Sequence, residues 1–111
     1  MCSVLLVCRF VVSSEETARF VERAERALAL LTEANGCLHG SLGRAVDGED
    51  RWVLVVRFES VVAYRRALSP FPVREHVIPL LSEALADEPA GFETLAEAEA
   101  GVVTTHPSLL A

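Results

Sequence analysis

The chain has 111 residues and a formal net charge of -6, and 51% of its residues are hydrophobic. These values predict one compact acidic domain and exclude two separate domains. The apolar runs are far shorter than the roughly 20 residues that cross a bilayer, and an acidic surface repels phosphate groups. We therefore expect neither a membrane nor a nucleic acid as partner.

The three cysteines, Cys2, Cys8 and Cys37, form no CxxC pair and are odd in number. This usage is typical of a reducing compartment. No positively charged segment precedes the first apolar run, as a signal peptide would require. We therefore expect a cytoplasmic protein. The three histidines match no common zinc-ligand spacing, so we expect no metal site.

The N-terminal third predicts a strand followed by a helix. Residues 1–12 are dense in apolar side chains on both faces of a strand, apart from Arg9. Residues 13–16 read Ser-Ser-Glu-Glu, a capping-box pattern that predicts the start of a helix. Apolar residues spaced by three and four continue this helix to Asn35-Gly36, which is typical of a left-handed helix end.

The middle of the chain predicts a hairpin. Residues 37–45 alternate weakly and include small side chains, whereas residues 51–58 show the strongest strand pattern in the chain. The Asp47-Gly48 pair between them is typical of a hairpin turn. We expect these two strands to be antiparallel.

The C-terminal half predicts a broken helical region and a last strand. Ser60 is placed to cap a helix that Pro70-Phe71-Pro72 interrupts, and Pro79 should kink the resumed helix or open a final short one. Residues 90–100 alternate as a strand, with helix as the alternative. We expect the domain to span residues 1–100, with a C-terminal tail of no clear pattern at 101–111.

The order β, α, β, β, α, β is that of the ferredoxin-like α+β fold with a four-stranded, antiparallel-type sheet. We expect the first and third strands to be central, parallel neighbours, with helices on one face. The other face is also apolar, at Leu5, Val7, Val11, Val53 and Val55. Because an exposed apolar face of this kind is unfavourable, we predict a homodimer in which two sheets pack face to face.

Arg9 and Arg57 interrupt the apolar faces of the first and third strands. Strand alternation predicts that both project away from the helices, toward a partner sheet. Buried cations there would require carboxylates such as Glu93 or Glu97. We favour this salt-bridge interpretation over an anion site at the dimer interface, because buried charges are normally paired.

Short motifs recur along most of the chain in a characteristic order. They are Gly36-Cys37-Leu38, Asp50-Arg51-Trp52-Val53-Leu54, Arg57-Phe58-Glu59-Ser60, Ala63-Tyr64, Ser69-Pro70-Phe71 and Ile78-Pro79-Leu80-Leu81. Over about residues 4–98 this pattern resembles the antibiotic biosynthesis monooxygenase family of dimeric α+β barrels. The resemblance implies a homodimer, and activities that range from cofactor-free oxidation of aromatic polyketides to haem degradation.

For the cofactor-free relatives, the resemblance implies a small aromatic or quinol-type ligand held between sheet and helices, which reacts as a carbanion with oxygen and needs no cofactor. In this chain we expect His76 and Tyr64 to be catalytic, as base and hydrogen-bond donor. Cys8, Trp52 and Phe58 are the expected substrate-binding residues. Each also has a simpler interpretation, which is core packing for the aromatic side chains and a solvent-facing helix position for His76.

Haem-degrading relatives, as the resemblance implies, carry an Asn on the first strand, a Trp at the end of the third and an iron-ligating His on the second helix. This chain has Cys8, Phe58 and His76 at those places, so only the histidine is kept. Our first hypothesis is therefore a cofactor-independent monooxygenase. The alternatives are a non-catalytic dimeric domain that binds a small ligand or acts as an accessory, and a haem-binding or haem-degrading monooxygenase.

Overall fold

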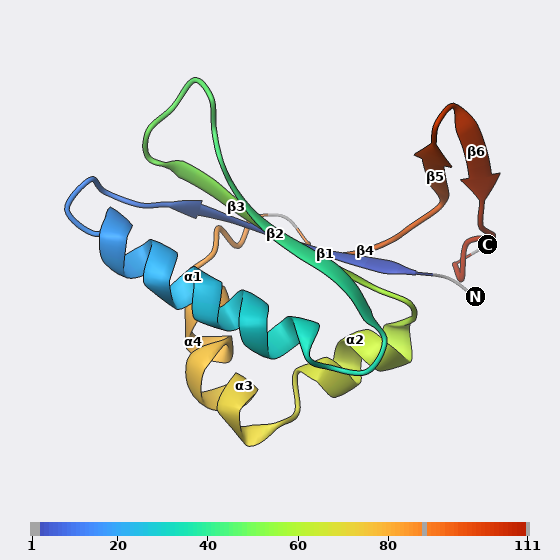
Figure 1. Ribbon diagram of the computed structural model, residues 1–111, viewed down its shortest axis with the longest axis horizontal. Helices are drawn as coiled ribbons and strands as arrows, with labels where there is room; N and C mark the ends of the chain where they lie inside the picture. Colours follow the sequence, from blue (N-terminus) through green and yellow to red (C-terminus); the bar gives the residue numbers. More distant parts are fainter. Residues whose placement is uncertain (1–2, 88, 111) are drawn as a thin grey trace.

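The structure is a computed structural model that describes residues 3–87 and 89–110. A sheet carries all the helices on one face, and a small hairpin stands apart near the C-terminus (Figure 1). Within the described residues, no helix is long and apolar enough to cross a membrane. The elements in chain order are β1 (Val4–Val11), α1 (Thr17–Thr32), β2 (Cys37–Arg44), β3 (Arg51–Phe58), α2 (Val61–Ala67), α3 (Phe71–His76), α4 (Ile78–Leu81), β4 (Gly91–Glu93), β5 (Ala96–Glu99) and β6 (Val102–Thr105).

The main sheet has the strand order β2-β3-β1-β4, and every neighbouring pair is antiparallel. This topology confirms the predicted α+β, ferredoxin-like fold. The expectation that β1 and β3 are parallel is wrong, although the two strands are adjacent as predicted. The crossover through α1 makes β1 and β2 parallel, and the hairpin loop at residues 45–50 then reverses β3, which inserts between them.

The core lies between the sheet and the helices. Alternate residues of β1 and β3 point toward the helices, and they include the almost fully buried Leu6, Cys8, Leu54, Val56 and Phe58. Helix α1 contributes side chains at spacings of three and four. Those that are buried are Phe20, Ala24, Ala27 and Leu31.

The opposite face of the sheet is open. Leu5, Val7, Val53 and Val55 are half-buried there, and Val11 at the end of β1 is 48% exposed. Strand alternation therefore divides the apolar residues between two faces, as the sequence predicted, and no helix of the described chain covers the second face (Figure 1).

Helix α1 begins later than the predicted capping box. The Ser13 carbonyl, and not its hydroxyl, accepts hydrogen bonds from Glu16 N and from Thr17 Oγ1, both at 3.0 Å. Residues 14–16 form a turn, and the helix starts at Thr17 with no side-chain cap. The helix ends at Thr32, earlier than the predicted end at Asn35-Gly36, although Gly36 has the left-handed φ expected there, +87°, which glycine adopts without strain.

Three short helices replace the predicted broken second helix. Ser60 caps α2 as predicted, because its Oγ accepts a hydrogen bond from Ala63 N at 3.0 Å. Pro70 follows the end of α2 and is the N-cap residue of α3. Pro79 lies in the first turn of α4, where proline needs no hydrogen bond, so the chain takes the second of the two predicted alternatives.

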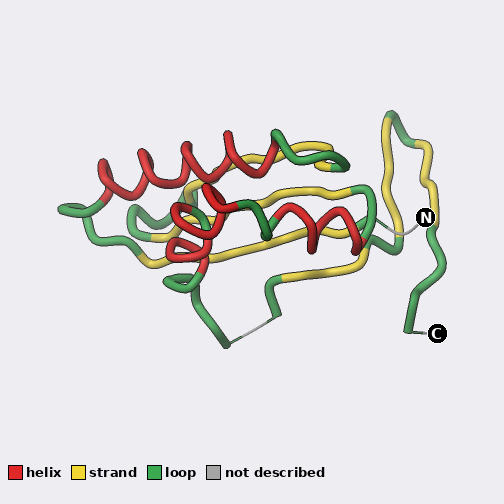
Figure 2. Tube along the Cα trace, turned by 90° about the horizontal axis from the view of Figure 1, so that it is seen from below, coloured by secondary structure: helices red, strands yellow, loops and turns green. Residues whose placement is uncertain are grey.

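The predicted last strand is only partly correct. Only Gly91–Glu93 joins the sheet, against β1, and Ala96–Glu99 pairs instead with Val102–Thr105. The expected patternless tail therefore contains a strand. This hairpin turns at Ala100-Gly101, where both residues have positive φ, and it stands beyond the end of the main sheet (Figure 2).

Leu54 provides a test of the core. Leu54→Ala should lower the free energy of unfolding by about 3 kcal/mol, because the removed side chain is fully buried between sheet and helices. Val46→Ala is the control, since Val46 is 99% exposed and should change stability by less than about 0.5 kcal/mol. Urea denaturation at one fixed protein concentration measures both, and equal effects would contradict this assignment of the core.

Candidate functional site

A cavity of about 400 Å³ lies between one edge of the sheet, helix α2 and the segment that follows α4. Its walls are mainly apolar, and its polar side chains are Cys8, Arg9, Tyr64 and Ser82. Its volume falls within the range of roughly 300–1,000 Å³ that is usual for small-molecule sites. The remaining lining residues are Leu6, Val7, Leu81, Ala84, Leu85, Ala86, Pro89 and Ala90. We refer to it below as the Tyr64 cavity.

Tyr64 is held by the capped start of α2. Its backbone N donates to the Ser60 carbonyl at 3.0 Å, and its ring packs against Phe58 with ring centroids 5.6 Å apart. A Cβ atom added at Gly91 would lie 3.6 Å from Tyr64 Oη, so the phenol reaches the strand β4 across the cavity. The phenol therefore presents a hydrogen-bond donor beside an apolar space.

Cys8 lies in the same cavity but is not set up as a nucleophile. It is buried on the helix-facing side of β1, as predicted. Burial raises the pKa of the Cys8 thiol to about 11, so the thiol stays neutral at physiological pH. It can serve as part of an apolar wall or as a weak hydrogen-bond donor.

His76 lies in a different place from Tyr64. It ends α3 and lines a cavity of about 280 Å³ whose walls are mostly charged. Its Nε2 lies 2.9 Å from Glu75 Oε1, and its Nδ1 lies 3.4 Å from an Arg26 Nη1 donor. The two predicted catalytic residues therefore do not share a cavity.

Trp52 and Phe58 also lie outside the lining of the Tyr64 cavity. Phe58 is fully buried and supports Tyr64 from the core side. Trp52 lines a cavity of about 310 Å³ at the other end of β3, where its ring packs on Phe20 at 5.5 Å. The Arg44 guanidinium lies 4.9 Å from the centre of the Trp52 ring, a cation–π arrangement. Of the five predicted site residues, Tyr64 and Cys8 line one cavity, and Phe58 packs against Tyr64 from the core.

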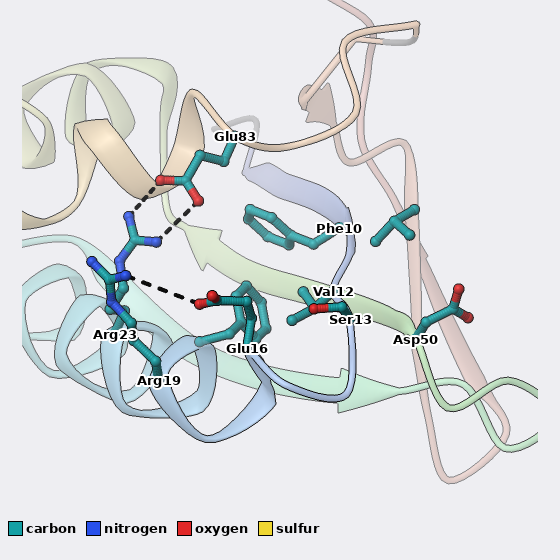
Figure 3. Close-up of a pocket in the computed structure, with 10 residues that line it drawn as sticks. Phe10, Val12, Ser13, Glu16, Arg19, Arg23, Asp50 and Glu83 are labelled. Carbon is teal, nitrogen blue, oxygen red and sulfur yellow. Dashed lines mark hydrogen bonds and ion pairs between the residues drawn. The ribbon is translucent and has the colours of Figure 1, made fainter.

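A larger cavity, of about 800 Å³, lies next to the N-terminal end of α1 (Figure 3). Phe10 and Phe20 line it with apolar surface, and their ring centroids are 5.0 Å apart. At its rim Arg23 Nη1 and Nη2 donate to the two Glu83 carboxylate oxygens at 2.9 and 2.6 Å. The sequence analysis missed this pair, because two residues separated by 60 positions give no local signal of their contact.

The two strand arginines have carboxylate partners within their own chain. Arg57 Nη1 lies 3.1 Å from Glu97 Oε1, which confirms the expected pairing with Glu97. Arg9 Nη2 lies 3.4 Å from Asp87 Oδ1, a partner that the sequence did not indicate. Glu97 also contacts His106 Nε2 at 2.8 Å, so one carboxylate connects Arg57 of β3 with the residue that follows β6. These pairs support the salt-bridge interpretation within one chain.

Within residues 3–87 and 89–110, no group of three or more His, Cys, Asp or Glu side chains is placed to hold a metal ion.

Comparison with known proteins gives a family and a fold. A family model described as antibiotic biosynthesis monooxygenase matches residues 3–70, which is more than half of the chain. SnoaB, a cofactor-independent oxygenase from Streptomyces nogalater, is similar with a TM-score of 0.71 and 23% identity, over 90% of this chain and 98% of that chain. A conserved protein from Methanosarcina mazei Go1 is similar with a TM-score of 0.68 and 16% identity, over 84% and 91% of the two chains. The curated proteins contain no match to this sequence.

The buried thiol predicts a pH dependence of stability. Since the pKa of Cys8 is about 11 in the folded protein and near 8.5 in an unfolded chain, the unfolded chain loses its thiol proton first as the pH rises. The free energy of unfolding should therefore fall between about pH 9 and pH 11, by on the order of 2 kcal/mol. Cys8→Ala should show a smaller fall over the same range. Denaturant midpoints at several pH values test this, and an identical fall in both proteins would contradict it.

Proposed function

Because the chain belongs to the antibiotic biosynthesis monooxygenase family, we propose that it is a cofactor-independent monooxygenase that acts on a small aromatic or quinol-type compound. The observation that carries this proposal is the Tyr64 cavity, in which a phenol donor and a neutral thiol face a mainly apolar space. A planar ring fits such walls, and a phenol donor suits a substrate oxygen that gains negative charge.

The proposed reaction inserts one atom of O₂ into an activated CH₂ group beside a phenolic or keto oxygen. The substrate carbon loses a proton to water, because the described lining of this cavity contains no His, Asp or Glu, and the charge spreads to the substrate oxygen. Tyr64 Oη donates a hydrogen bond to that oxygen. The carbanion forms a C–O bond with O₂, the peroxide takes up a proton, and loss of water leaves a C=O group. One oxygen atom enters the product and the other leaves as water.

Haem does not fit the residues around His76. Both ring nitrogens of His76 already face side chains, Glu75 on one side and Arg26 on the other. The cavity beside it is small and is lined mostly by charged residues of α1 and α3. A porphyrin needs a free imidazole nitrogen and apolar walls, and the surroundings of His76 offer neither.

A second candidate function, a non-catalytic dimeric domain that binds a small ligand, is favoured by one observation. The residue predicted as general base, His76, lies outside the Tyr64 cavity. A protein that binds an aromatic ligand without converting it needs the apolar walls and the phenol, but it needs no base.

In either case we propose a homodimer formed by the open faces of two sheets. The half-buried side chains Leu5, Val7, Val53 and Val55 form a continuous apolar surface across the two central strands. Packing against a second copy would remove this surface from water. We also propose the cytoplasm as its location, since Cys8 and Cys37 are both free thiols.

Oxygen consumption tests the proposed activity. Purified protein treated with chelator should consume O₂ when anthrones or hydroquinones are added, and Tyr64→Phe should lower kcat about 100-fold, because the donor to the developing oxyanion is lost. The variant His76→Ala shows which of the two cavities is the active site. Loss of activity in His76→Ala with an active Tyr64→Phe would move the site to His76, and ligand binding without turnover would favour the non-catalytic domain.

Sedimentation velocity tests the dimer. The protein should sediment as a species of twice the 12.0 kDa chain mass, and Val55→Arg should convert it to the monomer, because an unpaired charge would be buried between the sheets. Val46→Arg adds the same charge at an exposed loop position and should leave the dimer intact. A monomeric wild-type protein at micromolar concentration would contradict the proposal.

A further inference from the structure

A short segment without helix or strand, Ser82–Asp87, follows α4 and crosses the edge of β1. We call it the strap. Four of its side chains line the Tyr64 cavity, namely those of Ser82, Ala84, Leu85 and Ala86. They make up a third of the lining, and none of them belongs to a regular element. The wall of the candidate site is therefore formed in large part by the strap.

The strap is attached to α1 and β1 at three points. Near its start, Glu83 forms the two hydrogen bonds of 2.9 and 2.6 Å with Arg23 of α1. In the middle, Leu85 N donates to the Arg9 carbonyl at 2.8 Å. At its end, Asp87 Oδ1 lies 3.4 Å from Arg9 Nη2. Two of the three attachments are thus ion pairs, and the Arg23–Glu83 pair has the shorter distances.

The geometry of the Arg23–Glu83 pair makes it a stronger interaction than other surface ion pairs. The guanidinium meets both carboxylate oxygens, a bidentate geometry that is roughly twice as strong as a single neutral hydrogen bond. This hydrogen bonding lowers the pKa of the Glu83 carboxyl and raises the pKa of Arg23, so both groups stay charged near neutral pH. The pair therefore joins α1 firmly to the strap.

The strap also separates two cavities. Glu83 lines the 800 Å³ cavity, where Figure 3 shows its carboxylate directed at Arg23, whereas its neighbours Ser82 and Ala84 line the Tyr64 cavity. Phe10 and Cys8, two positions apart on β1, line the larger and the smaller cavity respectively. The strap and residues 8–10 of β1 therefore form the boundary between the two spaces.

We propose that the strap is a gate between the two cavities and that Arg23 and Glu83 are positioning residues which hold it closed. The larger cavity is then the vestibule through which an apolar aromatic molecule reaches Tyr64. The identity of the molecule that passes the gate rests on the proposed function, whereas the opening of the strap is independent of that function. Because exposed ion pairs weaken with ionic strength, added salt should increase the opening.

Amide hydrogen exchange tests the gate without any substrate. The amides of Glu83, Ala84 and Leu85 donate hydrogen bonds to Leu80, Leu81 and Arg9 carbonyls, so their exchange reports opening of the strap. In Arg23→Gln and in Glu83→Gln these three amides should exchange about fivefold faster, while amides of β1 and β3 keep their rates. The double variant Arg23→Glu with Glu83→Arg should restore slow exchange.

Arg19→Gln is the matched control, because it removes the same charge one turn earlier on α1. The Arg19 side chain pairs with Glu16 at 4.0 Å and acts on Glu83 only as a nearby charge, without a hydrogen bond to it. It should change the exchange of the strap much less than Arg23→Gln does. Unchanged strap exchange in Arg23→Gln and Glu83→Gln would overturn the proposal, as would an equal acceleration in Arg19→Gln. Equal acceleration of the strap and the sheet would also overturn it, because it would show a general loss of stability.

Turnover then distinguishes a gate from a mere structural contact. With anthrone as the probe, the looser gate in Glu83→Gln should change KM. It should leave kcat within about twofold of the wild-type value, since the Glu83 side chain does not reach Tyr64. A loss in kcat equal to that in kcat/KM would overturn the positioning role. Absence of turnover in every variant would count against the proposed monooxygenase, and the exchange result would still decide the gate.

Discussion

The alternation of side chains along β1 is the constraint on which the rest of the structure depends. This strand is central in the sheet, and its successive residues point to opposite faces. Leu6, Cys8 and Phe10 enter the core under the helices, while Leu5 and Val7 lie on the open face. One strand therefore supplies the hydrophobic core, one wall of the Tyr64 cavity and the centre of the surface proposed to meet a second copy.

Much of the fold could be predicted because local patterns agree with the tertiary structure. The strong alternation of β3, the Ser60 cap and the prolines that divide the second helical region each act within a few residues. The errors come from features that depend on distant contacts. The direction of β1 relative to β3 follows from the insertion of a hairpin strand, and the C-terminal segment leaves the sheet after Glu93 to pair with residues that carried no clear pattern.

The candidate site was predictable only in part. The side of β1 that carries Cys8 follows from strand alternation, and the position of Tyr64 follows from the cap of α2. The place of His76 depends on how α3 turns after Pro70, and a break of this kind changes the helix direction in a way that spacing does not encode. The Arg23–Glu83 contact joins segments far apart in the sequence, and Arg23 alone looks like one more charge on the solvent side of a helix.

The β5–β6 hairpin gives the molecule a region of low local stability. Two strands alone are marginally stable in water, and β6 is exposed at every residue. The side-chain ion pair between Glu97 and Arg57 joins the hairpin to the sheet. Opening of residues 96–110 would break this ion pair and the hydrogen bonds from Ser108 Oγ and Leu109 N to the Glu93 carboxylate. It would expose little of the core and would cost far less free energy than global unfolding. A protease should be able to remove this end of the chain while the sheet and its helices remain folded.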